Sequence, residues 1–120
     1  MKRLVLLALI TPIAAHATDL WCMPDKICAG TNCDIRFDEE SSLLLTNPDG
    51  SAPSLRSHAE TIGMTKTRDA DTVQWEGTDA HGEPEILAYR PATMRFTYLV
   101  GRDDLADYAQ YKATGVCEVQ

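Results

Sequence analysis

Short runs of alternating apolar and polar residues recur along this 120-residue chain, separated by Gly, Pro, Asn and Asp. After residue 17, no stretch keeps an apolar period of 3.6 residues over three turns. Successive side chains of a β-strand point to opposite faces, so a period of two marks a strand with one buried face. The chain is therefore expected to be all-β.

The alternation divides into seven or eight expected strands joined mostly by short turns. Asn47-Pro48-Asp49-Gly50 predicts a turn, 77–82 a hairpin connection, and 101–110 is the segment that could hold a helical turn. An antiparallel meander is the simplest topology. Closing it into a small barrel would remove the unpaired edges of a sheet, and an open sandwich is the alternative. The apolar pairs expected to share a strand face are Ile35 and Phe37, Leu43 and Leu45, Ile62 and Met64, and Val73 and Trp75, and Leu55 begins a strand of its own. In 85–90, Leu87 and Tyr89 are expected on one face and Ile86 and Ala88 on the other. In Met94–Val100 and in Tyr111–Val119, every second residue is expected on the same face.

The first seventeen residues predict export. Lys2 and Arg3 precede an apolar stretch, 4–15, and Ala15-His16-Ala17 has the small-x-small form of a cleavage site. The apolar stretch is shorter than the about 20 residues that a membrane-spanning helix needs. We therefore expect a signal peptide over 1–17, a single β domain over 18–120, a periplasmic or secreted location, and no membrane insertion after cleavage.

Four cysteines follow the expected cleavage site, and an exported chain with an even number of them favours two disulfides. Cys28 with Cys33 is the favoured pair because residues 29–32 between them are typical of a turn. Cys22 then pairs with Cys117 and joins the start of the domain to its end. The other pairing considered is Cys22 with Cys28, and Cys33 with Cys117.

The cysteine spacing does not favour metal or redox chemistry. It lacks the Cys-x2-Cys element that presents two thiolates to one zinc ion, and it contains no Cys-x-x-Cys redox pair. We therefore predict no metal ligands and no cofactor.

The expected mature chain is acidic. Without Lys2 and Arg3 it has nine basic and eighteen acidic residues, a formal net charge of −9 with neutral histidines. Such a surface repels nucleic acids and anionic lipids, and its simplest role is solubility. We expect a monomer whose partner is a protein or a small molecule.

No arrangement of residues predicts a catalytic site. Past the leader the histidines are His58 and His81, and no Gly-x-Ser-x-Gly element accompanies them. Ser57 adjoins His58, but neighbouring residues of a strand point to opposite faces. The acidic clusters 38–40, 69–71 and 103–107 lack the spacing of a calcium loop and are expected to be solvated turns. Paired carboxylates for glycoside cleavage are not located by sequence.

The large aromatic side chains are expected in the interior. One or both of Trp21 and Trp75 would plug the barrel ends or fill the core. With Phe37, Phe96 and Tyr98 also available, a filled barrel is favoured over one hollow enough to hold a small ligand.

Several short motifs carry a resemblance: Leu20-Trp21-Cys22, the Cys28 and Cys33 pair, the Ile35 and Phe37 alternation, Ala59-Glu60-Thr61 and Gly115-Val116-Cys117-Glu118. Together they resemble a group of small secreted bacterial proteins without an assigned activity, which implies export and a β fold. More distantly, the chain is similar to the periplasmic inhibitors of C-type lysozyme, small β-barrels with a disulfide between their terminal strands. The inhibitory loop of that family has Ser-Gly followed by a tyrosine, and this chain has no Ser-Gly.

Three functional hypotheses follow. The first is an exported, non-enzymatic β-barrel that binds a protein or small ligand. The second is an inhibitor of a cell-wall hydrolase, since an acidic surface suits a basic enzyme. The third is an enzyme that uses carboxylates, which would require a concave site holding two acidic residues with raised pKa values.

Overall fold

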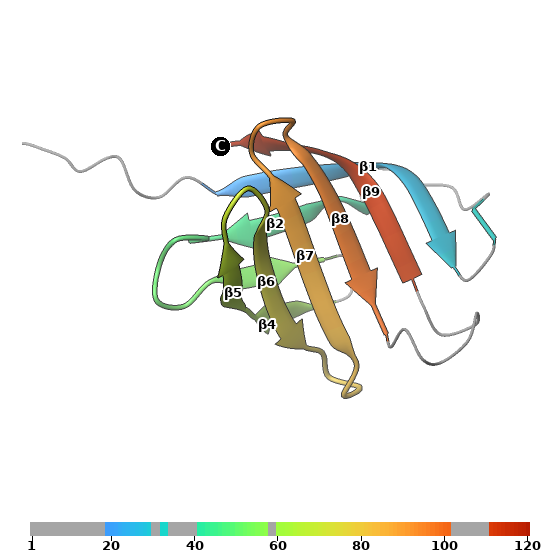
Figure 1. Ribbon diagram of the computed structural model, residues 1–120. Coiled ribbons are helices and arrows are strands. Elements are labelled where there is room, and N and C mark those ends of the chain that lie inside the picture. Colours follow the sequence, from blue (N-terminus) through green and yellow to red (C-terminus); the bar gives the residue numbers. More distant parts are fainter. Residues whose placement is uncertain (1–18, 30–31, 34–40, 58–59, 102–110) are drawn as a thin grey trace, which may run out of the picture.

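The protein is all-β in the computed structural model, which describes residues 19–29, 32–33, 41–57, 60–101 and 111–120 (Figure 1). The expected signal peptide, the Ile35 and Phe37 strand, the helical turn within 101–110 and His58 lie outside the described residues. The strands are β1 (Leu20–Ala29), β2 (Leu43–Thr46), β3 (Ser54–Arg56), β4 (Thr61–Gly63), β5 (Thr65–Asp69), β6 (Val73–Thr78), β7 (Pro84–Arg90), β8 (Arg95–Val100) and β9 (Tyr111–Val119).

These strands form one antiparallel sheet in the order β4-β3-β2-β1-β9-β8-β7-β6-β5. Consecutive strands pair from β1 to β4 and from β5 to β9, and β1 also pairs with β9. The two outer strands of this order, β4 and β5, are separated in the chain by Met64 alone. The expected meander is therefore confirmed, and it is nearly closed into a barrel (Figure 1).

The expected strand through Ile62 and Met64 is divided in two, β4 and β5. The backbone N–H of Met64 donates to the carbonyl oxygen of Pro53 at 2.9 Å, at the end of the β3 pairing. Before this point the chain pairs with β3, and after it the chain pairs with β6. The break at Met64 thus passes the chain from one half of the sheet to the other.

The pairing of β1 with β9 closes the sheet and carries the disulfide between the ends of the domain. The register runs from Leu20 opposite Val119 to Ala29 opposite Tyr111, with a bulge after Pro24. Cys22 and Cys117 lie directly opposite one another, fully buried, and are bonded.

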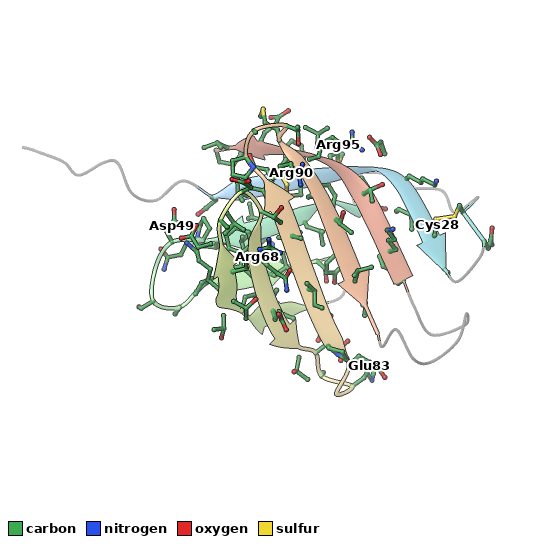
Figure 2. All side chains as sticks on the ribbon, in the orientation of Figure 1. Cys28, Asp49, Arg68, Glu83, Arg90 and Arg95 are labelled. Carbon is green, nitrogen blue, oxygen red and sulfur yellow. A yellow bond between two sulfur atoms is a disulfide. The ribbon has the colours of Figure 1, made fainter. Side chains whose placement is uncertain are left out.

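The second disulfide joins Cys28, which pairs with Lys112 near the end of the β1–β9 pairing, to Cys33 beyond it (Figure 2). Ala29 and Asn32 between them exchange two backbone hydrogen bonds, of 2.8 and 3.1 Å, so the chain turns back within four residues. The favoured connectivity of both disulfides is confirmed.

One end of the barrel is closed by the loop between β2 and β3. Trp75 points into the core with 2% of its surface exposed, and its indole N–H donates to the carbonyl oxygen of Pro48 at 2.9 Å. Lys66 holds the same loop through Asp49 at 2.7 Å (Figure 2). The expected Asn47–Gly50 turn is present, since the N–H of Gly50 donates to the carbonyl of Asn47 at 3.0 Å.

The core follows the predicted alternation with one correction, at Met94. Of the two tryptophans, Trp75 fills the core, and Trp21 lies half-buried on the outer face of β1 because its neighbour Cys22 points inward. Met94 is 42% exposed and lies in the β7–β8 turn with φ 61°, where a left-handed residue lets the chain reverse before Arg95. The buried hydrophobic residues are Leu20, Cys22, Ile27, Leu43, Leu45, Leu55, Ile62, Met64, Trp75, Leu87, Tyr89, Phe96, Tyr98, Ala113 and Cys117.

Gly77 permits the close approach of β4 to β6 that completes the barrel. A Cβ atom at this position would collide with the carbonyl oxygen of Gly63 and the sulfur of Met64. Gly77→Ala is therefore expected to lower the free energy of unfolding by about 2 to 3 kcal/mol, measured by urea denaturation. Gly63→Ala is the control, because its Cβ would have no neighbour within 4 Å. Equal effects of the two substitutions would contradict this account of closure.

The two disulfides are expected to contribute unequally to stability. Replacing Cys22 and Cys117 by alanine removes a link across 95 residues, for which loop entropy predicts a loss of about 4 to 5 kcal/mol. Replacing Cys28 and Cys33 removes a link across 5 residues, with a predicted loss of about 2 kcal/mol. Urea denaturation of the two double variants measures both values, and a larger loss from the second pair would be inconsistent with the entropic explanation.

Candidate functional site

A cavity of about 730 Å³ lies at the end of the barrel opposite Trp75. It lies where β7 begins and β8 ends, next to the β6–β7 turn at which Figure 2 labels Glu83. Its wall is largely apolar and aromatic, with three acidic side chains on one side. The described lining residues are Ser41, Leu43, Ser57, Glu60, Asp79, Ala80, His81, Glu85, Tyr98, Val100 and Tyr111.

Glu85 lies on the inward face of β7, at a position where the strand pattern calls for an apolar residue. It precedes Leu87 and Tyr89 at a period of two, and all three side chains are buried. Only 4% of the Glu85 surface is exposed. A carboxyl group at such a position loses its hydration, which must be compensated by hydrogen bonds or by protonation.

Tyr98 supplies one of these hydrogen bonds from the neighbouring strand. Its hydroxyl donates to Oε1 of Glu85 at 2.5 Å, and both groups are buried. The ring of Tyr98 meets the ring of Tyr111 edge to face, with centroids 6.1 Å apart. Strands β7, β8 and β9 thus present one carboxyl group and two tyrosine side chains to the cavity.

Asp79 and Glu60 reach the cavity from turns. Asp79 opens the β6–β7 turn, where its Oδ1 accepts hydrogen bonds from the backbone N–H groups of His81 and Glu83, both at 2.9 Å. Glu60 precedes β4, and its Oε1 accepts from the N–H of Ala80 at 3.3 Å.

The carboxylates of Glu60, Asp79 and Glu85 form the acidic cluster of the cavity. One oxygen from each residue lies within 4.8 Å of the other two. None of the three is ion-paired with a Lys or Arg of the described residues. Within the described residues no Lys or Arg balances their negative charge, and His81 is the basic side chain close to Asp79.

The surroundings push the pKa values of Glu85 and Asp79 in opposite directions. Burial raises the pKa of Glu85, assisted by the charges of Asp79 and Glu60 and opposed by the Tyr98 hydrogen bond. Burial also acts to raise the pKa of Asp79, but the backbone N–H groups and Glu85 stabilise its anion and lower its pKa overall. Glu85 thus retains its proton to a higher pH than Asp79 does.

Both tyrosines resist ionisation. Burial raises the pKa of Tyr98, and its hydrogen bond to Glu85 raises it further. Burial alone raises the pKa of Tyr111. The phenol groups therefore stay neutral at physiological pH.

The residues that the sequence offered as candidates lie in different parts of the structure. His81 is exposed in the β6–β7 turn, as expected, and lines the cavity. Ser57 also lines it, but its hydroxyl is bonded to the carbonyl of Glu60 at 3.3 Å. Asp69 and Asp71 flank the turn between β5 and β6, at the opposite end of the barrel. The clusters 38–40 and 103–107 lie outside the described residues.

The sequence patterns did not predict a functional role for Glu60, Asp79 or Glu85. A usable signal existed for Glu85, since its spacing from Leu87 and Tyr89 places a charge on a buried strand face. Glu60 and Asp79 carried no such signal, because turns are usually acidic and solvated.

An enzyme that uses carboxylates would require a concave site holding two acidic residues with raised pKa values, and this condition is met in part. The concave acidic site exists, but of the pair Glu85 and Asp79 only Glu85 has a raised pKa. Retaining glycosidases separate their two carboxyl groups by about 5 to 5.5 Å to admit the sugar bond. In this cluster one oxygen from each carboxylate lies within 4.8 Å of the other two.

Two smaller hollows lack a cluster of carboxylates among their described lining residues. One, of about 230 Å³, adjoins Trp75 at the closed end. The other, of about 370 Å³, lies along β7 and β8 beside Arg90 and Arg95, which Figure 2 labels. Arg95 is ion-paired there with Asp25 at 3.0 Å.

Comparisons of the chain with protein-family models, curated proteins and solved structures find no match. Within the described residues, no helix is long and apolar enough to cross a membrane.

Glu85→Gln is expected to gain stability relative to the parent protein as the pH rises. The pKa of Glu85 is raised on folding, so its favourable contribution is complete below the unfolded pKa and is lost as the pH rises through the folded pKa. Glutamine has no charge to lose and keeps an oxygen for the Tyr98 hydroxyl. Urea denaturation between about pH 4 and pH 8 measures the difference.

The control for this experiment is Glu118→Gln, which removes an exposed carboxylate from the far end of β9. Its effect on the free energy of unfolding should change little over the same pH range. An equally flat profile for Glu85→Gln would be evidence against a buried, proton-retaining Glu85.

Proposed function

We propose that this protein is an exported, non-enzymatic binding protein that holds a small ligand in the cavity at the open end of its β-barrel. The observation that carries the proposal is the cavity itself, about 730 Å³ in volume, with the buried carboxyl of Glu85 in its wall. Cavities that bind small molecules are typically about 300 to 1,000 Å³, largely apolar, with a few converging polar groups.

The scaffold suits binding by a preformed site. Glu85, Tyr98 and Tyr111 project from three neighbouring strands, and strand positions hold side chains more firmly than loops do. The Cys22–Cys117 disulfide joins β9 to β1 toward the Trp75 end, and the Cys28–Cys33 disulfide lies next to the Ala29–Tyr111 pair at the cavity end of β9. A ligand would therefore meet a wall that is already in place, which reduces the ordering cost of binding.

The disulfides and residues 1–17 together support the proposed location. Two disulfides are typical of proteins that fold in an oxidising compartment. Residues 1–17 have the composition of a secretory signal peptide. A periplasmic or secreted binding protein accounts for both features.

A second candidate is an enzyme that uses carboxylates, favoured by the opposed pKa directions of Glu85 and Asp79. Such a pair can divide the roles of proton donor and proton acceptor. In this reading Glu85 would donate the proton and Asp79 would accept it. The two candidates differ in whether a bound molecule is chemically changed.

The test is a ligand-observed NMR screen of small fragments that include amines, alcohols, carboxylates and sugars. Val100 lines the cavity, so Val100→Trp should fill it and reduce the saturation-transfer signal of a bound fragment at least about fivefold. Val116→Trp is the matched control, because Val116 lies on the outer face of β9 with 39% of its surface exposed.

Each result decides between the candidates. Fragments that bind the parent and Val116→Trp but not Val100→Trp support the binding proposal. If no fragment of any class binds in a manner sensitive to Val100→Trp, the proposal fails. Conversion of a bound fragment into products, abolished by Glu85→Gln, would support the enzyme instead.

A further inference from the structure

Resting on the proposed function, we infer that the ligand is a primary amine on a small apolar body, with its ammonium group held between the carboxylates of Glu60, Asp79 and Glu85. The inference deepens the binding proposal by naming the chemical class of the ligand. It rests on three features of the cavity: the uncompensated charge, the spacing of the acceptors, and the apolar remainder of the wall.

The charge of the described cavity lining favours a cation. Glu60, Asp79 and Glu85 converge on one side of it, and its described lining includes no Lys or Arg. His81 is the one basic group among those lining residues, and it is exposed on the turn. A neutral or anionic ligand would leave the acidic cluster unpaired after water is displaced, which is unfavourable.

The spacing of the cluster matches an ammonium group. Three oxygens within 4.8 Å of one another share a central point that is at most about 2.8 Å from each. Charge-assisted N–H···O bonds have donor–acceptor distances of about 2.7 to 2.9 Å. A primary ammonium carries three N–H donors, one for each carboxylate.

The rest of the cavity fits an apolar body better than a bare metal ion. A metal ion would occupy only a small part of about 730 Å³. Leu43, Val100 and the edge-to-face rings of Tyr98 and Tyr111 form the remaining wall. A short alkyl or aromatic group would be buried against these side chains, and the tyrosine faces also favour a nearby cation.

Binding of the ammonium is coupled to release of a proton. The groups that face Glu85 are Asp79, Glu60, Tyr98 and, farther off, Tyr111 and His81. In the empty cavity, repulsion from the first two favours the protonated Glu85 carboxyl. An ammonium beside Glu85 favours its anion instead, so the carboxyl proton passes to the solvent as the amine enters.

The experiment is isothermal titration calorimetry with n-hexylamine on the full mature protein. The matched ligands are 1-hexanol, which lacks the charge, and hexyltrimethylammonium, which keeps the charge but has no N–H donor. We expect n-hexylamine to bind at least about tenfold more tightly than either. Titrations at one pH in two amine-free buffers of different ionisation enthalpy should give different heats because a proton is released to the buffer, and affinity should increase with pH over the range in which Glu85 titrates.

The variants assign the effect to the cluster. Glu60→Gln and Glu85→Gln should each weaken n-hexylamine binding at least about tenfold, and Glu85→Gln should also remove the buffer dependence. Glu118→Gln should change neither. A lysine blocked at both its amino and carboxyl groups distinguishes the source of the amine: tighter binding than n-hexylamine indicates a lysyl side chain of a polypeptide, and weaker binding a free small amine.

Several outcomes would overturn the inference. They are equal binding of 1-hexanol, unchanged binding by Glu85→Gln, or binding of calcium chloride without binding of the amine. If fragments of another class bind in the cavity while amines do not, the inference fails and the binding function stands. If nothing binds in a manner sensitive to Val100→Trp, both fail.

Discussion

The pairing of β1 with β9 is the constraint on which the rest of the structure depends. These strands lie at the two ends of the domain, and their contact turns an open meander into a nearly closed barrel (Figure 1). The long-range link between Cys22 and Cys117 holds this contact from within the core. Without it, β9 would be an edge strand, and Tyr111 would lose its fixed place beside the cavity.

Closure makes the two ends of the barrel chemically different. At one end the β2–β3 loop covers the core, and the Trp75 indole is bonded to the carbonyl of Pro48. At the other end the interior opens into a cavity with Glu85 in its wall. Among the described residues, the interior is filled in the middle and at the first end, and a cavity remains at the second; Phe37, one of the residues expected to fill the interior, lies outside the described residues. A filled core supplies stability, and the open end leaves space for a ligand.

Much of the fold could be predicted because strand alternation is local. Leu43 with Leu45, and Phe96 with Tyr98, point inward as their period of two requires. Met94 was misplaced because the hairpin geometry, and not its hydrophobicity, determines where β8 begins. The candidate site was harder to predict. The β6–β7 hairpin brings Asp79 near Glu85, but Glu60 precedes β4 and reaches them only because β4 lies against β6 in the nearly closed sheet, an approach that no short segment contains.

Glu85 is the residue for which stability and function make opposite demands. The fold would accept an apolar residue at this inward position, as it does at Leu87 and Tyr89. A carboxyl there loses hydration, and two further carboxylates nearby increase the penalty. The hydroxyl of Tyr98 offsets part of that cost, and retention of a proton offsets more. A cation in the cavity would remove the rest, so the group that is least favourable in the empty barrel is the one that gains most from a bound ligand.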